Sequence, residues 1–139
     1  MPSRFMLDTN ICIYIRRMRP APVLERFRSL ARGDAVISVV TYGELRYGAE
    51  KSLTRERALE MLDEFVALVP VQPLSPPAGT AYGAIRSALE REGQVIGGND
   101  LWIAAQARAD DLTLVTNNER EFGRVPGLRI DNWANDPLR

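Results

Sequence analysis

Acidic and amide side chains follow short apolar runs at four places in this sequence. Asp8 follows the first run, Glu44 the second and Asp100 the third, while Asn117 and Asn118 follow the fourth. Charged groups are rarely left in apolar surroundings unless they are paired or bind a metal. Carboxylate and carboxamide oxygens are the ligands that Mg²⁺ and Mn²⁺ favour. The pattern therefore indicates one acidic, metal-holding site.

The sequence contains no histidine and one cysteine. The absence of histidine excludes Ser-His-Asp triads, Cys-His dyads, paired-histidine nuclease chemistry and most zinc sites. Cys12 lies in the apolar segment 11–15, where a small thiol packs well, so we interpret it as a structural residue. Any hydrolytic chemistry must therefore depend on carboxylates.

The segments around these side chains alternate between strand-like and helix-like patterns. We expect strands at 4–8, 35–39, 69–74, 112–115 and 128–130, with a polar tail after the last. We expect helices at 11–15, 23–30, 41–49, 55–68, 77–92 and 101–109. Such alternation predicts an α/β fold with a mostly parallel central sheet flanked by helices on both faces. Ligand sites in these sheets lie beyond the carboxyl ends of the strands, where the candidate side chains fall.

The composition is that of an ordinary globular protein. Of the 139 residues, 45% are hydrophobic and 26% are charged, so we expect one domain over residues 1–139. No apolar run approaches the roughly 20 residues of a membrane-spanning helix. The first residues also lack the pattern of a secretory signal. We therefore expect a cytoplasmic protein without a membrane partner.

Helix capping is an alternative explanation for each acid. Asp8 is of a type that is favoured at N-caps, and Glu44 follows Thr41 at the spacing of a capping box. Asp100 is expected to cap the helix at 101–109, and residues 116–119 also have capping-box spacing. Four helix starts at one sheet edge, each with an oxygen ligand, are more than capping requires. The coincidence favours a metal site.

The basic residues are all arginine except Lys51, and the formal net charge is zero. A guanidinium group binds phosphate with two parallel hydrogen bonds, so the bias is compatible with a nucleic-acid partner. Codon bias is an equally good explanation. If a local patch binds RNA, the candidates for it are Arg16, Arg17, Arg19, Arg120 and Arg124.

Four ordered motifs carry a resemblance to a known family. They are Met6-Leu7-Asp8-Thr9-Asn10-Ile11-Cys12-Ile13, Ile37-Ser38 with Thr41-x-x-Glu44-Leu45-x-Tyr47-Gly48, Ile96-Gly97-x-Asn99-Asp100-x-x-Ile103-Ala104, and Leu114-Val115-Thr116-Asn117-Asn118-x-x-Glu121-Phe122. Over nearly the whole chain they resemble the PIN-domain ribonucleases, and within these the VapC toxins of bacterial toxin–antitoxin pairs. The resemblance implies a single PIN domain over residues 1–139, with a PIN-like three-layer α/β/α fold.

The resemblance also implies a role for each acid. In that family, the acids that match Asp8, Glu44 and Asp100 are catalytic and hold Mg²⁺ or Mn²⁺ for RNA cleavage. A fourth acid often stands where this chain has Asn118, a neutral carboxamide, which puts the full binding of a second metal in doubt. Glu121 is a candidate to supply the missing charge, and a surface helix residue is the alternative.

Metal ligands usually need outer hydrogen-bond partners, so we expect Ser38 and Thr116 to hold the carboxylates in place, with plain strand or cap residues as the alternative. The chain shares the ending Thr116-Asn117-Asn118-x-x-Glu121-Phe122 with the enteric type of VapC. That likeness implies a metal-dependent endoribonuclease that inhibits translation by cutting tRNA. The anticodon stem-loop of initiator tRNA is the leading candidate substrate.

The resemblance further implies a VapB-type antitoxin, a homodimer and a toxin–antitoxin hetero-oligomer. The amphipathic segments 23–30 and 55–68 are candidates for the antitoxin groove and dimer contact, with ordinary core packing as the alternative. A PIN-like module that binds RNA or a partner without cutting it is the main rival, suggested by Asn118. A phosphorylation receiver needs a lysine that Lys51 does not match, and a haloacid-dehalogenase phosphatase needs an acid where Asn10 stands.

Overall fold

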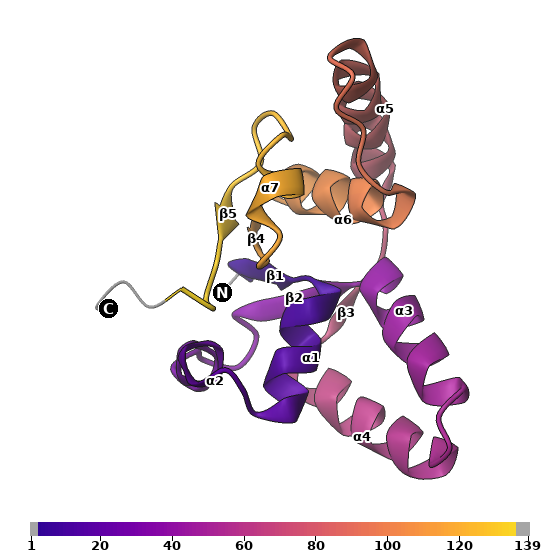
Figure 1. The fold of residues 1–139 in the computed structure, drawn as a ribbon, viewed down its shortest axis with the longest axis vertical. Coiled ribbons are helices and arrows are strands. Elements are labelled where there is room, and N and C mark those ends of the chain that lie inside the picture. The colour runs from indigo at the N-terminus through magenta and orange to yellow at the C-terminus, as the bar shows by residue number, and fades with distance from the viewer. Residues whose placement is uncertain (1–2, 136–139) are drawn as a thin grey trace.

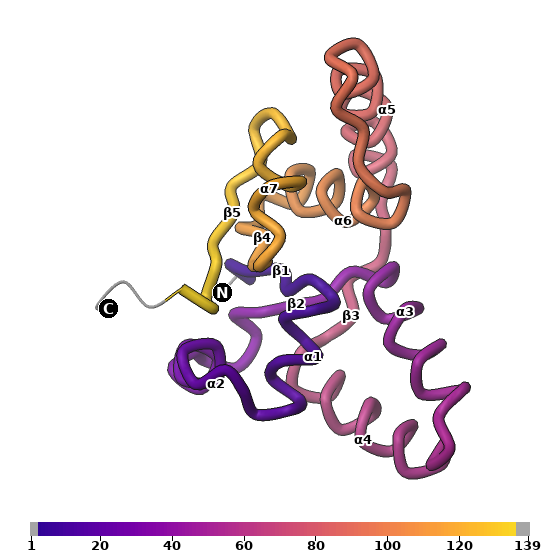
Figure 2. Tube along the Cα trace, viewed as in Figure 1, coloured from indigo at the N-terminus to yellow at the C-terminus, as the bar shows by residue number. Residues whose placement is uncertain are grey.

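A parallel sheet lies at the centre of the computed structural model, which describes residues 3–135. The strands are β1 (Phe5–Leu7), β2 (Ala35–Ser38), β3 (Val71–Gln72), β4 (Thr113–Val115) and β5 (Ile130–Asp131). The helices are α1 (Thr9–Arg17), α2 (Ala21–Arg28), α3 (Val39–Glu50), α4 (Arg55–Leu68), α5 (Pro76–Arg91), α6 (Gly98–Ala109) and α7 (Glu119–Phe122). Figure 2 traces the path of the chain through these elements.

The order of the strands in the sheet is β3-β2-β1-β4-β5, and neighbouring strands run parallel. From β1 the chain builds the sheet outward through β2 to β3, and it then returns to add β4 and β5 on the other side of β1. The topological switch point therefore lies between β1 and β4, where the carboxyl ends of the strands leave a crevice for a ligand.

Alternate residues of the strands build two separate cores. Met6 and Leu114 face a core shared with α5, α6 and α7, whereas Leu7 and Ile37 face a core shared with α1, α2, α3 and α4. This alternation follows from the two-residue period of a strand. Figure 1 shows α5, α6 and α7 on one side of the sheet and α1, α2 and α4 on the other. The predicted three-layer α/β/α fold is confirmed.

Five helices, α1, α2, α3, α5 and α6, begin earlier than the sequence patterns predict, and at α3 and α6 the difference changes the role of an acid. The hydroxyl of Ser38 accepts a hydrogen bond from the Val40 N–H (3.0 Å), so α3 begins at Val39. The predicted capping box from Thr41 to Glu44 is therefore wrong. Helix α6 begins at Gly98 with its first turn closed by the backbone bond from Leu101 N–H to the Gly97 carbonyl (2.9 Å). Asp100 thus lies inside the first turn of α6 and is not its cap.

The predicted polar tail contains a core residue. The Trp133 side chain is fully buried and meets the Phe5 ring edge-on, with centroids 5.4 Å apart. Its indole N–H donates to Asp131 (3.2 Å), and Arg26 of α2 pairs with the same carboxylate (3.2 Å). The segment that contains Asp131 and Trp133 therefore packs into the same core as α2. The sequence did not reveal it because one tryptophan outside any periodic segment carries no pattern.

The amphipathic helices α2 and α4 turn their apolar faces inward. Val23 of α2 and Leu62 and Phe65 of α4 are buried in the same core. Core packing, the alternative explanation of these segments, therefore accounts for these side chains. Cys12 is also fully buried there, and burial raises the pKa of its thiol well above the usual value, as expected for a structural residue. None of the helices in residues 3–135 is long and apolar enough to cross a membrane.

Candidate metal centre

The ends of β1 and β4 hold Asp8 and Thr116 side by side. Leu7 pairs with Val115, and the Asp8 N–H donates to the Val115 carbonyl (3.0 Å). The Asp8 side chain is buried, its Oδ1 accepts from the Ile11 N–H (3.0 Å), and the Thr116 hydroxyl donates to the same carboxylate. Asp8 is therefore the N-cap of α1, as the capping explanation predicted, and it also lies at the switch point. Thr116 makes the contact expected of a residue that orients Asp8.

Opposing influences act on the Asp8 carboxylate. Burial raises its pKa the most, because a charged group loses its hydration there. The hydrogen bonds from Thr116 and from the Ile11 N–H lower the pKa, and the nearby charge of Glu44 raises it. The protein thus supplies donors to Asp8 and at the same time places a second carboxylate near it. A nearby cation would reduce the electrostatic repulsion between the two carboxylates.

Glu44 points back from α3 toward the start of α1. Its Oε1 accepts a hydrogen bond from the Thr9 hydroxyl (2.8 Å), which joins the residue after Asp8 to the acid of the second motif on α3. Thr9 was not among the site residues predicted from the sequence. Its position in the first motif, directly after Asp8, was the one available signal. Thr9 orients the Glu44 carboxylate in the way that Thr116 orients Asp8.

Asp100 has the most perturbed carboxyl group of the site. Its pKa is raised to about 6, first by burial and then by the charges of Glu121, Glu44 and Asp8. A hydrogen bond with Glu121 also raises the pKa. The carboxylates of Asp8 before α1, Glu44 in α3 and Glu121 in α7 therefore all act on Asp100 in α6. Asp100 thus lies within electrostatic range of the other two acids predicted from the sequence and of Glu121.

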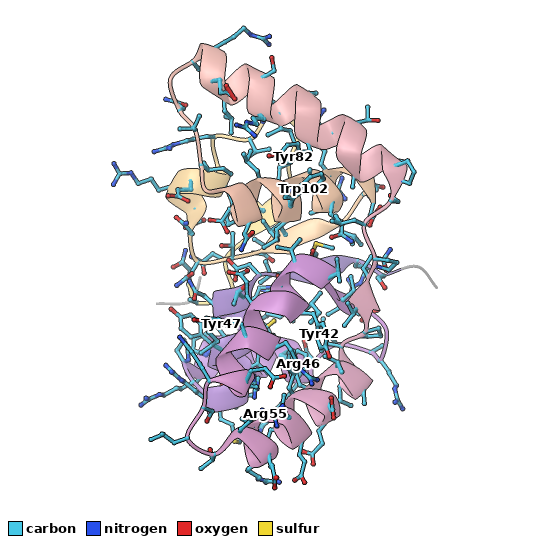
Figure 3. The ribbon with its side chains drawn as sticks, turned by 90° about the vertical axis from the view of Figure 1, so that its right-hand side faces the viewer. Tyr42, Arg46, Tyr47, Arg55, Tyr82 and Trp102 are labelled. Carbon is cyan, nitrogen blue, oxygen red and sulfur yellow. The ribbon has the colours of Figure 1, made fainter. Side chains whose placement is uncertain are left out.

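Helix α6 is held against α5 by an aromatic stack. The ring of Trp102, two residues after Asp100, lies on the ring of Tyr82 with centroids 3.9 Å apart and planes 16° apart (Figure 3). Such stacked pairs stabilise a contact beyond the area they bury. The stack fixes the first turn of α6, and with it the position of Asp100.

Asn118 and Glu121 form a local pair at the start of α7. Asn118 is the N-cap, and its Oδ1 accepts from the Glu121 N–H (3.5 Å), while its Nδ2 donates to the Glu121 carboxylate (3.2 Å). The Thr116 Oγ1 in turn accepts from the Asn118 N–H (2.9 Å). Asn118 therefore caps the helix and orients Glu121, whose carboxylate meets Asp100.

The other predicted site residues have different surroundings. Ser38 is buried and caps α3, and in the described part of the chain its hydrogen bonds do not reach a carboxylate. Arg124 donates to the Val95 carbonyl (3.2 Å), which fastens the loop before α6. The remaining predicted arginines lie at the end of α1, in the turn after it and in α7, namely Arg16, Arg17, Arg19 and Arg120.

The donor set suits a divalent cation that prefers oxygen. Within residues 3–135, no three acidic or cysteine side chains converge closely enough to form a ready-made metal cage. In the same residues, no arginine or lysine forms an ion pair with any of the four carboxylates, so a cation there would meet uncompensated negative charge. Mg²⁺ retains several waters and uses few direct protein ligands, so a loosely gathered carboxylate set fits it.

A family model and solved structures match this chain over most of its length. The model described as PIN domain matches residues 5–128. The chain belongs to the PIN-domain family. The relative named tRNA(fMet)-specific endonuclease VapC, from Shigella flexneri, is 48% identical over 131 residues, which are 94% of this chain and 98% of that protein. Ribonuclease VapC2 from Haemophilus influenzae is 43% identical over the same shares of the two proteins.

The DNA-bound VapBC of Salmonella typhimurium matches the PIN fold of this chain with a TM-score of 0.88 at 43% identity, covering 94% of this chain and 98% of that chain. The resemblance to PIN-domain ribonucleases and VapC toxins is thus confirmed. The receiver and dehalogenase-type alternatives are wrong, because the PIN domain accounts for the sequence and the fold together.

The crowding of charge at Asp100 makes stability depend on pH. In the folded protein its pKa is about 6, against an ordinary 3.8. The folded state therefore keeps this proton after the unfolded state has lost it, so wild-type stability falls as pH rises from about 4 to 6. The metal-free Asp100→Asn variant should match the wild type near pH 4 and exceed its free energy of unfolding by on the order of 1–2 kcal/mol at pH 7, after allowance for solvent screening.

Urea unfolding in EDTA at a series of pH values measures this difference. Asp63→Asn, an exposed position on α4, is the control and should change little at any pH. A stabilisation by Asp100→Asn that is equal at pH 4 and pH 7, or absent at both, would contradict the repulsion described for this site.

Proposed function

We propose that this protein is a metal-dependent endoribonuclease and the toxin of a type II toxin–antitoxin pair. The observation that carries the proposal is a set of four carboxylates at the β1/β4 switch point that influence the pKa of Asp100, namely Asp100 itself in α6, Asp8 at the N-cap of α1, Glu44 in α3 and Glu121 in α7. Clustered carboxylates in a crevice are the usual way in which a nuclease holds a divalent cation. The names of the relatives, ribonuclease and endonuclease, support the same reaction class.

Asp8, Glu44 and Asp100 would hold Mg²⁺ or Mn²⁺, with Glu121 as the fourth carboxylate. When bound, the ion would lower the pKa of a water and shield the negative charge that develops on the phosphate during hydrolysis. The Thr116 hydroxyl donates to Asp8, which orients its carboxylate and lowers its pKa, and the Thr9 hydroxyl donates to Glu44 and orients that carboxylate. These two threonines therefore prepare the carboxylates for the cation before it arrives.

The proposed substrate is tRNA, with the anticodon stem-loop of initiator tRNA as the first candidate. The Shigella flexneri relative is named for tRNA(fMet), and it is 48% identical to this chain. Cleavage of initiator tRNA would inhibit translation, and its site of action would be the cytoplasm. Arg17 at the end of α1 and Arg120 in α7 are exposed and would contact RNA phosphates.

The proposed protein partner is a VapB-type antitoxin in a toxin–antitoxin hetero-oligomer. The Salmonella typhimurium structure that matches this chain is a DNA-bound VapBC complex, and so is that of VapBC2 from Rickettsia felis. A homodimer of the toxin is part of the same proposal. Light scattering after size exclusion, with and without the antitoxin, measures both assemblies.

The rival function is a PIN-like module that binds RNA without cutting it. Its basis is the neutral Asn118 at a position where an acid is common in this family. In this chain Asn118 donates to the Glu121 carboxylate, which meets Asp100. The negative charge is therefore present three residues further along the chain. This contact favours the enzyme over the binding module.

Removal of the Asp8 charge should abolish cleavage and leave the fold intact. Asn at this position keeps a side-chain acceptor for the N-cap of α1, so Asp8→Asn preserves the helix start. With total bacterial tRNA and Mg²⁺ or Mn²⁺, we expect discrete fragments from the wild type and a loss of rate of roughly 100-fold or more in Asp8→Asn. EDTA should stop the wild-type reaction.

Glu60→Gln, an exposed position on α4, is the matched control and should cleave as the wild type does. Circular dichroism confirms that each variant is folded. Fragments that persist in EDTA would refute the metal dependence, and intact tRNA in every lane of folded protein would favour the binding module.

Glu121→Gln tests whether this residue supplies the fourth carboxylate. The variant keeps the size of the side chain and its hydrogen bonds but removes its charge. We expect cleavage to slow by roughly 10–100-fold, the range for residues that support a metal site. Glu119→Gln, an exposed neighbour in α7, is the control. Equal rates for the two variants would make Glu121 a surface helix residue, the alternative considered from the sequence.

A further inference from the structure

A surface pocket lies where α1 ends and the chain turns toward α2. Its volume is about 300 Å³, near the lower end of the roughly 300–1,000 Å³ range of small-ligand pockets. It is lined by Tyr14, Arg17, Arg19, Pro20 and Ala134. Among the described residues, the lining thus combines one aromatic ring with two guanidinium groups and contains no acidic residue.

A tight turn at the end of α1 builds this pocket. Met18 has a left-handed backbone conformation (φ 60°) and ends the helix. The N–H groups of Met18 and Arg19 donate to the carbonyls of Ile15 (3.0 Å) and Tyr14 (3.1 Å). The chain therefore folds back over the last turn of α1, and Arg17 and Arg19 both reach the pocket from either side of the turn.

The pocket is coupled to the metal centre through one hydrogen bond. The Tyr14 hydroxyl accepts from the Asn117 side-chain amide (2.6 Å), and Asn117 directly follows Thr116, which donates to Asp8. Tyr14 lies six residues after Asp8, which is about 9 Å along a helix at 1.5 Å per residue. Figure 2 shows α1 running from the end of β1 to this turn.

The two arginines of the pocket are available to bind an anion. Within residues 3–135, neither Arg17 nor Arg19 has a carboxylate within ion-pair distance, and both are exposed. Guanidinium groups bind phosphate in a planar, two-pronged geometry. An aromatic ring beside them offers a surface on which a nucleobase can stack. A phosphate joined to a base is the chemistry that matches both features.

We propose that this pocket binds one nucleotide of the substrate RNA, at the other end of α1 from the carboxylates where the phosphodiester bond is cut. The base lies against Tyr14 and Pro20, and its phosphate lies between Arg17 and Arg19. The proposal rests on the proposed ribonuclease function and adds a second anchor for the RNA. Two contacts, one at the carboxylates and one at the pocket, fix the direction of the strand across the crevice.

The test measures binding of a fluorescein-labelled single-stranded RNA of twelve nucleotides in EDTA, over a range of salt concentrations. Arg17→Ala/Arg19→Ala should weaken binding about 10-fold or more and reduce the slope of log affinity against log salt by about two, roughly one for each guanidinium. The control is Arg57→Ala/Arg91→Ala, which removes two exposed arginines at α4 and α5. It should leave the slope within about one of the wild type.

A second pair of variants separates the ring from the hydroxyl of Tyr14. Tyr14→Phe keeps the stacking surface and should bind RNA within about twofold of the wild type, whereas Tyr14→Leu should bind about 10-fold more weakly. Thermal unfolding checks that both are folded. Because Arg17 and Arg19 are exposed, the arginine variant decides the question even if Tyr14→Leu does not fold.

Cleavage of tRNA in Mg²⁺, measured on the same proteins, separates this inference from the proposed function. If the wild type does not cut tRNA, the proposed function fails, whatever the binding result. If the wild type cuts tRNA and the arginine pocket variant binds and cuts as the control variant does, the pocket proposal is overturned. Slower cleavage with weaker RNA binding in the pocket variant alone supports it.

Discussion

The parallel pairing of β1 with β4 is the constraint on which the site depends. Because Leu7 pairs with Val115, the chain leaves both strands at the same level of the sheet. Asp8, from the first motif, therefore meets Thr116, from the last. The strand order places this pair at the topological switch point, and the starts of α1, α6 and α7 supply acids around it. A shift in that register would separate the two motifs.

Electrostatic repulsion among the carboxylates of the site favours the binding of a cation. Four carboxylates act on one another without a cationic side chain beside them among the described residues, and Asp100 carries the largest shift in pKa. A protein tolerates such crowding where a bound cation removes it, since the binding energy of the ion is added to the stability of the fold. Asn118 contributes by orienting Glu121 and adds no fifth charge.

The sequence predicted the layers of the fold and the main acids, because these depend on local patterns. Apolar periodicity marks strands and helices, and Asp8 and Asp100 stand directly beside such segments. The contacts from Thr9 to Glu44 and from Asn117 to Tyr14 join residues far apart in the chain, so no local pattern reveals them. Trp133 was missed for the same reason, since its burial depends on Phe5 at the other end of the domain.

Helix starts were the least predictable local feature. The spacing of a capping box was present at Thr41 and Glu44. However, the Ser38 hydroxyl accepts a hydrogen bond from the Val40 N–H, so α3 starts before Thr41. The N-cap of a helix is the residue whose side chain lies close enough to accept from a free backbone N–H of the first turn. Which residue this is depends on where the preceding strand ends. Because Glu44 consequently lies in the second turn, its carboxylate points to Thr9 and not to its own helix start.

The most direct test of the account is a titration of metal-free protein with Mn²⁺, followed by thermal unfolding. If the carboxylates hold a divalent cation, the melting temperature of the wild type rises with the Mn²⁺ concentration, corresponding to about 2.7 kcal/mol at 100 times the dissociation constant. The melting temperature of Asp8→Asn/Asp100→Asn should not respond. An unchanged melting temperature in the wild type, or an equal rise in the double variant, would contradict a metal centre at the β1/β4 switch point.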